Sequence, residues 1–321
     1  MTDPPDESAA SAGLDSADAF SLLGDATRLE VVTALHEDAR DAPLRFSALY
    51  DRVEVADSAQ FNYHLKQLRP HFVSKVEDAY ELTAAGRRLA RAVTAGTYTD
   101  SPRLEPFEND GYCHACGADA LWASYEDETF SIECRGCGEA VLDVRAPPTV
   151  VRGRDPEEVV TAFELWSRMG IEQARRGICP ECGGPVEPRI TEPFSDPLDF
   201  EVLPAFDCAV CGRRAMTSFG GLAAQHPAVE EFHRERGTSL EDRPYWEIPQ
   251  YVSGEHVRIV SRDPWLARIS FFADGDACHV EIDGDLDVVE VEVVAGERPE
   301  DISDDETSGD ATSGDATSEG A

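Results

Sequence analysis

Hydrophobic residues recur with the period of an α-helix through the first hundred residues of the chain. In residues 26–37, Leu29, Val32 and Leu35 fall on one face of a predicted helix. The pattern predicts further helices over residues 17–23, 46–53, 59–69 and 83–93, with Ser16 and Asp57-Ser58 as caps. Residues 72–76 and 80–82 flank the turn Glu77-Asp78-Ala79 and predict a short hairpin. Residues 16–96 are therefore expected to form a compact unit of helices and one hairpin.

Near the C-terminal end the pattern changes to the alternation of polar and apolar residues that is typical of strands. The segments HVRIVS, LARISFFA, CHVEI and VVEVEV are separated by the turns DPW, DGD and DGDLD. They predict an antiparallel β meander over residues 251–296. Residues 1–15 and 297–321 are acidic and poor in large apolar residues, so both are expected to be disordered. Residues 97–107 are expected to form a linker.

Eight of the nine cysteines form four CxxC pairs, and a glycine follows every pair. Two residues between thiolates allow one tight turn to present both sulfurs to a tetrahedral ion at about 2.3 Å. The glycine can adopt the positive φ that such a turn requires. The spacing predicts two four-cysteine zinc ribbons with helices, over residues 108–176 and 177–250. The expected ligands are Cys113, Cys116, Cys134 and Cys137 for one zinc ion, and Cys179, Cys182, Cys208 and Cys211 for the other.

The segments between the pairs differ in length. In the first zinc ribbon, ALWASYE and FSIEC around DET predict the hairpin that joins the two cysteine pairs. The second zinc ribbon has room for a larger loop with turn residues Pro193 and Asp196-Pro197. Disulfides and a dithiol redox site are the alternatives, but eight regularly paired cysteines in a chain without a secretory signal favour metal. Four cysteines per ion leave no position for water, so both zinc ions are expected to be structural.

The helix predicted over residues 59–69 has two distinct faces. Phe61, Leu65 and Leu68 form its core face, and polar side chains cover the opposite one. Amide, phenol and ammonium groups on such a helix can contact base edges in the major groove of DNA. The alternative is the solvated face of an ordinary helical domain. The candidate DNA-binding residues are Ser58, Gln60, Asn62, Tyr63, Lys66, Gln67, Arg69 and Lys75.

Local charge favours nucleic acid over the solvated face. Residues 58–96 carry six basic and three acidic residues, and the only two lysines of the chain, Lys66 and Lys75, lie among them. This basic region stands in a chain with a net charge of −36. The turn of the predicted hairpin is an exception, because Glu77 and Asp78 would repel phosphate. Within the hairpin, Lys75 is therefore the expected contact.

Three motifs in this order and spacing resemble ArsR-like winged helix-turn-helix transcriptional regulators. They are FSLLGDATRL at residues 20–29, NYHLKQLR at 62–69 and YELTAAGRR at 80–88. The resemblance covers about a quarter of the chain, residues 16–96, and implies a winged helix that binds double-stranded DNA as a homodimer. The chain departs from the family at one point, because no cysteine precedes Cys113. Metal sensing by cysteines in the third helix is therefore not expected.

The chain is unusually acidic, with 64 acidic against 28 basic residues. Such an acid-rich, lysine-poor composition resembles proteins of halophilic archaea, which keep molar salt in their cytoplasm. At about 1 M salt the Debye length is only about 3 Å, so the net charge does not exclude DNA binding. No apolar run approaches the roughly 18 residues of a membrane span. A cytoplasmic protein is expected.

Together these patterns predict an α+β protein that acts as a sequence-specific transcriptional regulator with two structural zinc ions. A basal transcription adaptor resembling TFIIE-alpha is the alternative, because it also joins a winged helix to a zinc ribbon. An enzyme is not expected, since Cys278 fits the core of a strand and aspartates in DGD segments fit turns. The candidate enzyme residues are Cys278, His279, Asp274, Asp276, Asp283, Asp285 and Asp287.

Overall fold

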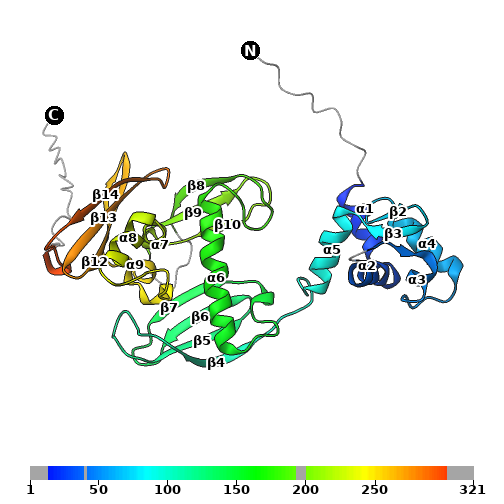
Figure 1. Ribbon diagram of the computed structural model, residues 1–321, viewed down its shortest axis with the longest axis horizontal. Coiled ribbons are helices and arrows are strands. Elements are labelled where there is room, and N and C mark those ends of the chain that lie inside the picture. Colours follow the sequence, from blue (N-terminus) through cyan, green and yellow to red (C-terminus); the bar gives the residue numbers. More distant parts are fainter. Residues whose placement is uncertain (1–13, 40–41, 193–199, 302–321) are drawn as a thin grey trace, which may run out of the picture. The chain divides into compact units, whose positions relative to one another are not determined.

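The computed structural model describes residues 14–39, 42–192 and 200–301. The chain is a mixed α+β protein with antiparallel sheets, and it divides into two compact units (Figure 1). The first unit runs to Pro102 and includes Pro147–Arg152, and the second comprises Arg103–Ala146 and the chain from Gly153. Among the described residues, no helix combines the length and the apolar character needed to cross a membrane. The predicted disorder of residues 1–13 and 302–321 lies outside the described residues.

Among its described residues, the first unit contains five α-helices, a 3₁₀ helix (Pro148–Val150) and a three-stranded antiparallel sheet with the order β1-β3-β2. The predicted helices and hairpin are all present. A two-residue strand, β1, which the sequence did not predict, pairs with β3. The elements are α1 (Ser16–Leu23), α2 (Ala26–Asp38), β1 (Leu44–Arg45), α3 (Phe46–Tyr50), α4 (Ser58–Leu68), β2 (Val73–Val76), β3 (Ala79–Leu82) and α5 (Ala84–Thr94).

Side-chain caps set where the helices of the first unit begin. Asp57 precedes α4, and its carboxylate accepts from the backbone N–H groups of Ala59 and Gln60. Helix α4 ends before Pro70, with Arg69 in the extended conformation that a following proline favours. The cap of α1 is Asp15 and not Ser16 as predicted, because its carboxylate accepts from the backbone N–H of Asp18.

The core of the first unit forms around the apolar face of α4. Phe61, Leu65 and Leu68 are fully buried, as their helical spacing predicted. The ring of Phe61 packs edge-on against Phe46 and Tyr50, with centroids 5.0 and 5.4 Å away. Because these rings fix the rotation of α4 about its axis, the opposite face of the helix is held toward solvent.

The second unit begins with a four-stranded antiparallel sheet in the order β4-β5-β6-β7. Its strands are β4 (Leu104–Asn109), β5 (Leu121–Glu126), β6 (Thr129–Cys134) and β7 (Ala140–Arg145). The hairpin predicted between the first cysteine pairs is β5–β6. The predicted linker is wrong over residues 104–107, which belong to β4 and pair with β5. The long helix α6 (Pro156–Arg175) follows, capped by Asp155.

The second cysteine-rich segment forms a three-stranded antiparallel sheet in the order β10-β9-β8. Its strands are β8 (Val186–Thr191), β9 (Leu203–Cys208) and β10 (Arg214–Met216). The turn residues expected in its loop, Pro193 and Asp196-Pro197, lie outside the described residues. Three short helices follow, α7 (Phe219–Ala224), α8 (Pro227–Glu235) and α9 (Pro249–Val252).

The predicted meander is an antiparallel sheet in the order β11-β12-β13-β14, whose inner face packs on α7 and α8. Its predicted start at residue 251 is wrong, because Tyr251 and Val252 belong to α9. Its strands are β11 (Val257–Arg262), β12 (Trp265–Ala273), β13 (Asp276–Asp283) and β14 (Val288–Val294). The disorder predicted from residue 297 is wrong at its first residues. Glu297 is hydrogen-bonded to His279, and Pro299–Asp301 form a turn of 3₁₀ helix.

Candidate metal centres and nucleic-acid interface

The four CxxCG segments adopt the same backbone conformation. In each, the glycine N–H donates to the carbonyl of the first cysteine, and the N–H of that cysteine donates to the residue after the glycine. These bonds close a tight turn, for example Gly117 N to Cys113 O at 2.8 Å. The four glycines have φ between 69° and 84°, a region that side chains disfavour. The glycine after each pair is therefore required by the turn, as predicted.

The four CxxC pairs combine two by two, and each set of two pairs brings its four sulfurs into one cluster. In the first, Cys113 and Cys137 Sγ are 3.8 Å apart, and Cys116 and Cys134 Sγ are 3.7 Å apart. In the second, the corresponding distances are 3.7 and 3.5 Å, between Cys179 and Cys211 and between Cys182 and Cys208. Four thiolates at about 2.3 Å from a tetrahedral ion lie about 3.8 Å from one another. All eight predicted ligands thus form two clusters that could hold metal ions.

All nine cysteines are free thiols, so neither cluster contains a disulfide. Backbone N–H groups stabilise the thiolate form of one sulfur in each cluster. The N–H groups of Cys211 and Val210 donate to Cys208 Sγ and, against the effect of burial, lower the pKa of Cys208 to about 6. Burial opposes the ionisation of Cys134, but donation from Cys137 and Gly136 outweighs it and lowers the pKa of Cys134 to about 7.

Aromatic and cationic side chains surround the two clusters. Arg135, inside the turn of Cys134, lies over the ring of Trp122 at 3.3 Å. At the second cluster, Gln173 of α6 donates to the carbonyl of Cys179, and Arg213 lies 5.9 Å from the ring of Trp166. His114 points to Glu139, at 3.7 Å, and is not part of the sulfur cluster. The helix α6 is therefore attached directly to the second cluster.

The candidate DNA-binding residues lie together on α4 and beside it. Ser58, Gln60, Tyr63 and Lys66 are exposed, and Asn62 and Gln67 are half-buried on the flanks of the same face. Tyr63 exposes 56% of its surface although it is aromatic. Arg69 follows the helix directly, and Lys75 lies on β2. The polar face of α4 is thus open to solvent along its length.

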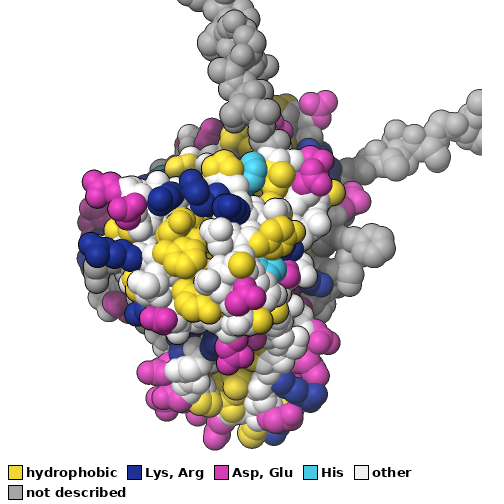
Figure 2. Space-filling model, turned by 90° about the vertical axis from the view of Figure 1, so that its right-hand side faces the viewer, with side chains coloured by type: hydrophobic (Ala, Val, Ile, Leu, Met, Phe, Trp, Pro, Cys, Tyr) yellow, Lys and Arg dark blue, Asp and Glu magenta, His cyan; other side chains and the backbone are white. Residues whose placement is uncertain are grey.

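Basic residues also occur in the elements that follow α4, on β2 and α5. Figure 2 shows one face of the molecule, on which Lys and Arg side chains lie beside hydrophobic and uncharged ones. Two of the basic groups already have partners. Arg87 donates to the carbonyl of Leu82, and Lys75 lies 3.8 Å from the exposed Asp78. The acidic hairpin turn therefore offsets part of the charge of Lys75.

A buried histidine on α4 was not predicted. His64 lies among the core residues, and its Nδ1 is 3.4 Å from the carboxylate of Asp25, the residue that caps α2. The contact ties the start of α2 to the middle of α4. The sequence places Asp25 and His64 far apart, and no spacing rule connects them.

Cys278 and His279 do not form a catalytic pair. They are neighbours on β13, so their side chains leave opposite faces of the sheet. Cys278 is buried in the core, and burial raises the pKa of its thiol to about 11. His279 instead contacts Ser270 Oγ at 2.9 Å and Glu297 at 3.0 Å. These hydrogen bonds attach the segment after β14 to the sheet.

The aspartates of the meander are divided between two places. Asp274 and Asp276 lie at the start of β13, and Asp283, Asp285 and Asp287 lie at its end. Asp276 pairs with Arg236, while Asp283 accepts from the backbone N–H groups of Asp285 and Asp287. The described aspartates therefore act in turns and do not assemble one cation site.

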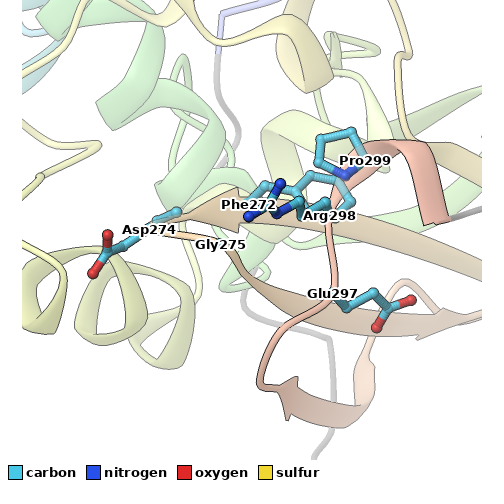
Figure 3. A pocket seen from close by; sticks show the side chains of 7 residues that line it. Phe272, Asp274, Gly275, Glu297, Arg298 and Pro299 are labelled. Atoms are coloured by element: carbon cyan, nitrogen blue, oxygen red, sulfur yellow. The ribbon is translucent and has the colours of Figure 1, made fainter.

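A shallow hollow lies beside the turn between β12 and β13. Figure 3 shows Phe272, Arg298 and Pro299 close together, while the carboxylates of Asp274 and Glu297 point away from them. A ligand site usually combines an enclosed apolar wall with converging polar groups. The hollow has neither, so the sulfur clusters and the face of α4 remain the candidate sites.

Two family models match the chain. Residues 110–288 match a domain of unknown function, DUF7351, and residues 16–93 match another domain of unknown function, DUF7347. The first match covers more than half of the chain and contains all nine cysteines, and the second covers the unit that carries α4. Comparison with curated proteins and with solved structures gives no match.

Proposed function

Because the chain belongs to the family of the domain of unknown function DUF7351, whose description assigns no activity, we propose its function from its own residues. We propose that it is a sequence-specific DNA-binding transcriptional regulator and not an enzyme. Its first unit would bind double-stranded DNA as an ArsR-like winged helix-turn-helix. Its second unit would be held together by two structural zinc ions.

The order of elements in the first unit supports a winged helix. Helices α2, α3 and α4 precede the hairpin β2–β3, and α5 closes the unit. In a helix-turn-helix the second helix of the pair enters the major groove. Helix α4 would be that second helix, and the hairpin would be the wing. The match to DUF7347 ends with α5 and carries no functional description.

The open polar face of α4 is the observation that carries the proposal. Aromatic packing of Phe61 fixes the rotation of the helix, so Gln60, Asn62 and Lys66 point away from the core. Amide side chains can pair with adenine and lysine with guanine in the major groove. Lys66 and Arg69 also supply positive charge for phosphate contacts. An ordinary solvated helix in so acidic a chain would more often carry carboxylates, and α4 has none.

The sulfur geometry supports zinc as the metal in both clusters. Cysteine-only tetrahedral sites select zinc or iron–sulfur chemistry, and pairs on ribbon turns are typical of structural zinc. No water position remains when four sulfurs bind one ion. The metal would therefore hold the sheets of the second unit together and would not take part in a reaction.

The test of DNA binding begins with the full chain. Crosslinking across the genome identifies the bound sites, and a gel shift at molar KCl then measures affinity for one site and for a scrambled version. We expect Asn62→Ala and Lys66→Ala each to raise the Kd by about 10-fold to 100-fold, since a base contact contributes about 1–3 kcal/mol.

The matched control removes the same charge elsewhere. Arg258 is exposed on β11 of the second unit, and Arg258→Ala should leave the affinity unchanged. Circular dichroism verifies that each variant is folded. Equal affinity of wild type and both α4 variants would refute the assignment. A few discrete genomic sites would support a regulator, and binding at most promoters would favour the TFIIE-alpha-like adaptor instead.

We propose that the regulator is a homodimer, as its resemblance to ArsR-like proteins implies. Two copies present two α4 helices, and such a pair would read two half-sites about one turn of DNA apart. A two-fold repeat in the crosslinked sites, with half-sites about 10 base pairs apart, would support this arrangement.

A further inference from the structure

Helix α6 exposes an apolar stripe on the side that faces away from its own unit. Leu165 and Met169 are one turn apart and expose 62% and 61% of their surfaces. Ala162 lies beside them on the same face, half-buried. Large apolar side chains so exposed, and stacked along one helix, are typical of a surface that another protein covers. Figure 1 shows α6 as a long helix lying across the sheet of the first cysteine cluster.

The opposite face of α6 already makes the contacts that the fold needs. Val159 and Phe163 are fully buried, and the ring of Phe163 stacks on Phe130 of β6 with centroids 4.2 Å apart. Further along the helix, Ala174 is buried on this face, while Gln173 is exposed on the flank of the helix and donates to the carbonyl of Cys179. The helix is therefore held by its inner face. Leu165 and Met169 add nothing to that attachment.

The order of polar and apolar residues along the exposed stripe is nearly the same from either end of α6. Helical spacing places Glu158, Thr161, Leu165, Met169, Gln173 and Arg176 along it in order. In an antiparallel pair of such helices, centred midway between Leu165 and Met169, Leu165 of one copy meets Met169 of the other. Thr161 then meets Gln173. Each large apolar residue thus covers the other, and each polar residue meets a polar one.

The charges at the two ends of the stripe are complementary in this arrangement. The N-terminal end carries Glu157 and Glu158, and the C-terminal end carries Arg175 and Arg176. Arg176 exposes 70% of its side chain and pairs with Glu172 of its own helix. An antiparallel pair brings Glu158 of each copy opposite Arg176 of the other. The helix dipoles also oppose each other favourably in this orientation.

We propose that α6 is a surface through which two copies of this chain associate, antiparallel about a two-fold axis that crosses the Leu165–Met169 stripe midway between these two residues. An isologous contact uses the same patch on both copies, and the stripe meets that requirement without a second surface. A helix pair alone buries less than the roughly 800 Å² per partner of a standard interface, so we expect micromolar affinity. The inference rests on the proposed homodimer but not on DNA binding. A monomeric chain that binds DNA would still give a gel shift. The proposed dimer contact and the proposed DNA binding can therefore fail separately.

The test measures the dimer dissociation constant of the full zinc-loaded chain by sedimentation at several concentrations. Leu165→Glu with Met169→Glu should raise that constant by at least about 10-fold, since apolar residues at the centre of an interface dominate its energy. The matched control places the same two charges on β14, at Val289 and Val293, which expose 54% and 51% of their surfaces. Val289→Glu with Val293→Glu should leave the dissociation constant unchanged.

A charge exchange tests the antiparallel register. Glu158→Arg alone and Arg176→Glu alone should each weaken the dimer, because each places like charges opposite one another. The double variant should recover most of the wild-type affinity in low salt. A wild-type chain that stays monomeric at about 100 µM, well above a micromolar dissociation constant, would overturn the proposal. So would an unchanged constant in the Leu165 and Met169 variant, or a double variant as weak as the single ones.

Discussion

Phe61 and Tyr63 stand two residues apart on α4 and meet opposite surroundings. Phe61 is fully buried between Phe46 and Tyr50, while Tyr63 exposes more than half of its surface. Both are aromatic, so composition does not distinguish them. Helical periodicity does, because Phe61 shares its face with Leu65 and Leu68. The two residues therefore separate the part of α4 that holds the fold from the part that is open to a partner.

The free energy of unfolding of the first unit should respond to only one of these two residues. Phe61→Ala leaves a cavity among aromatic rings and should lower that free energy by about 3–5 kcal/mol. Tyr63→Ala should change it by less than about 0.5 kcal/mol, since an exposed side chain is removed. Urea unfolding followed by far-ultraviolet circular dichroism measures both. A large loss of stability in the Tyr63 variant would mean that α4 is rotated from the orientation described.

The cysteine ligands are the residues that the sequence predicted best. Their spacing is local, and each turn closes within six residues. The spacing of Cys113 and Cys116 in the sequence is therefore enough to predict the turn that holds them. The polar chain of Ser270, His279 and Glu297 had no such signal. Its members come from β12, β13 and the segment after β14, and only the pairing of these strands brings them together. Sequence spacing identifies sites that one turn builds, and it misses those that a sheet assembles.

At the scale of elements, α5 and α6 each contain one glycine inside the helix, in different surroundings. A Cβ added at Gly86 of α5 would lie 2.1 Å from the backbone carbonyl oxygen of Phe72. A Cβ at Gly170 of α6 would meet nothing within 4 Å. The glycine of α5 therefore permits a close approach between the helix and the chain before β2. The glycine of α6 only weakens its helix.

Alanine at these two positions should have opposite effects on stability. Gly86→Ala must displace backbone and should destabilise the first unit by about 1–3 kcal/mol. Gly170→Ala removes conformational freedom from the unfolded chain and should stabilise the second unit by about 0.5–1 kcal/mol. Chemical unfolding of the full chain measures both changes. A stabilising Gly86→Ala would contradict the close packing of α5 on Phe72.

Element prediction succeeded where the periodicity was long and failed where pairing alone defines a strand. The meander and the five α-helices of the first unit follow from repeated apolar positions. Strand β1 has two residues, Leu44 and Arg45, and exists only because β3 lies beside it. Strand β4 contains Pro106 and an irregular register against β5, so residues 104–107 read as a linker. Both strands depend on neighbours distant in sequence.

At the scale of the whole molecule, the two units carry different spectroscopic reporters. All four tryptophans, Trp122, Trp166, Trp246 and Trp265, and all nine cysteines belong to the second unit. Trp122 and Trp166 lie beside arginines that adjoin the cysteine pairs. Tryptophan fluorescence therefore follows the second unit alone, and the state of its metal sites in particular.

Zinc removal should alter the second unit and spare the first. Metal analysis of the purified chain should give two zinc ions, and Cys116→Ser or Cys182→Ser should each reduce this to one. A chelator should shift the tryptophan emission to longer wavelength, because structural zinc contributes directly to folding. Binding of an isolated half-site by α4 should persist, since no cysteine lies in the first unit.

The control for this experiment replaces the one cysteine outside the clusters. Cys278 is buried in the meander, and Cys278→Ala should keep both zinc ions. Zinc content below two in the Cys278 variant, or full zinc content in both serine variants, would contradict the assignment of ligands. Loss of half-site binding on chelation would show that the first unit depends on the metal as well.

In each CxxC turn the first cysteine is a buried residue and the second is an exposed one. Cys113, Cys134, Cys179 and Cys208 are buried, and Cys116, Cys137, Cys182 and Cys211 are exposed. An ion in either cluster would thus be anchored from within and reachable from outside. A competing thiolate in solution could replace the outer sulfurs one at a time, without any opening of the core. Exchange of the metal would then be governed by the speed of ligand substitution, while its retention would be governed by the stability of the fold.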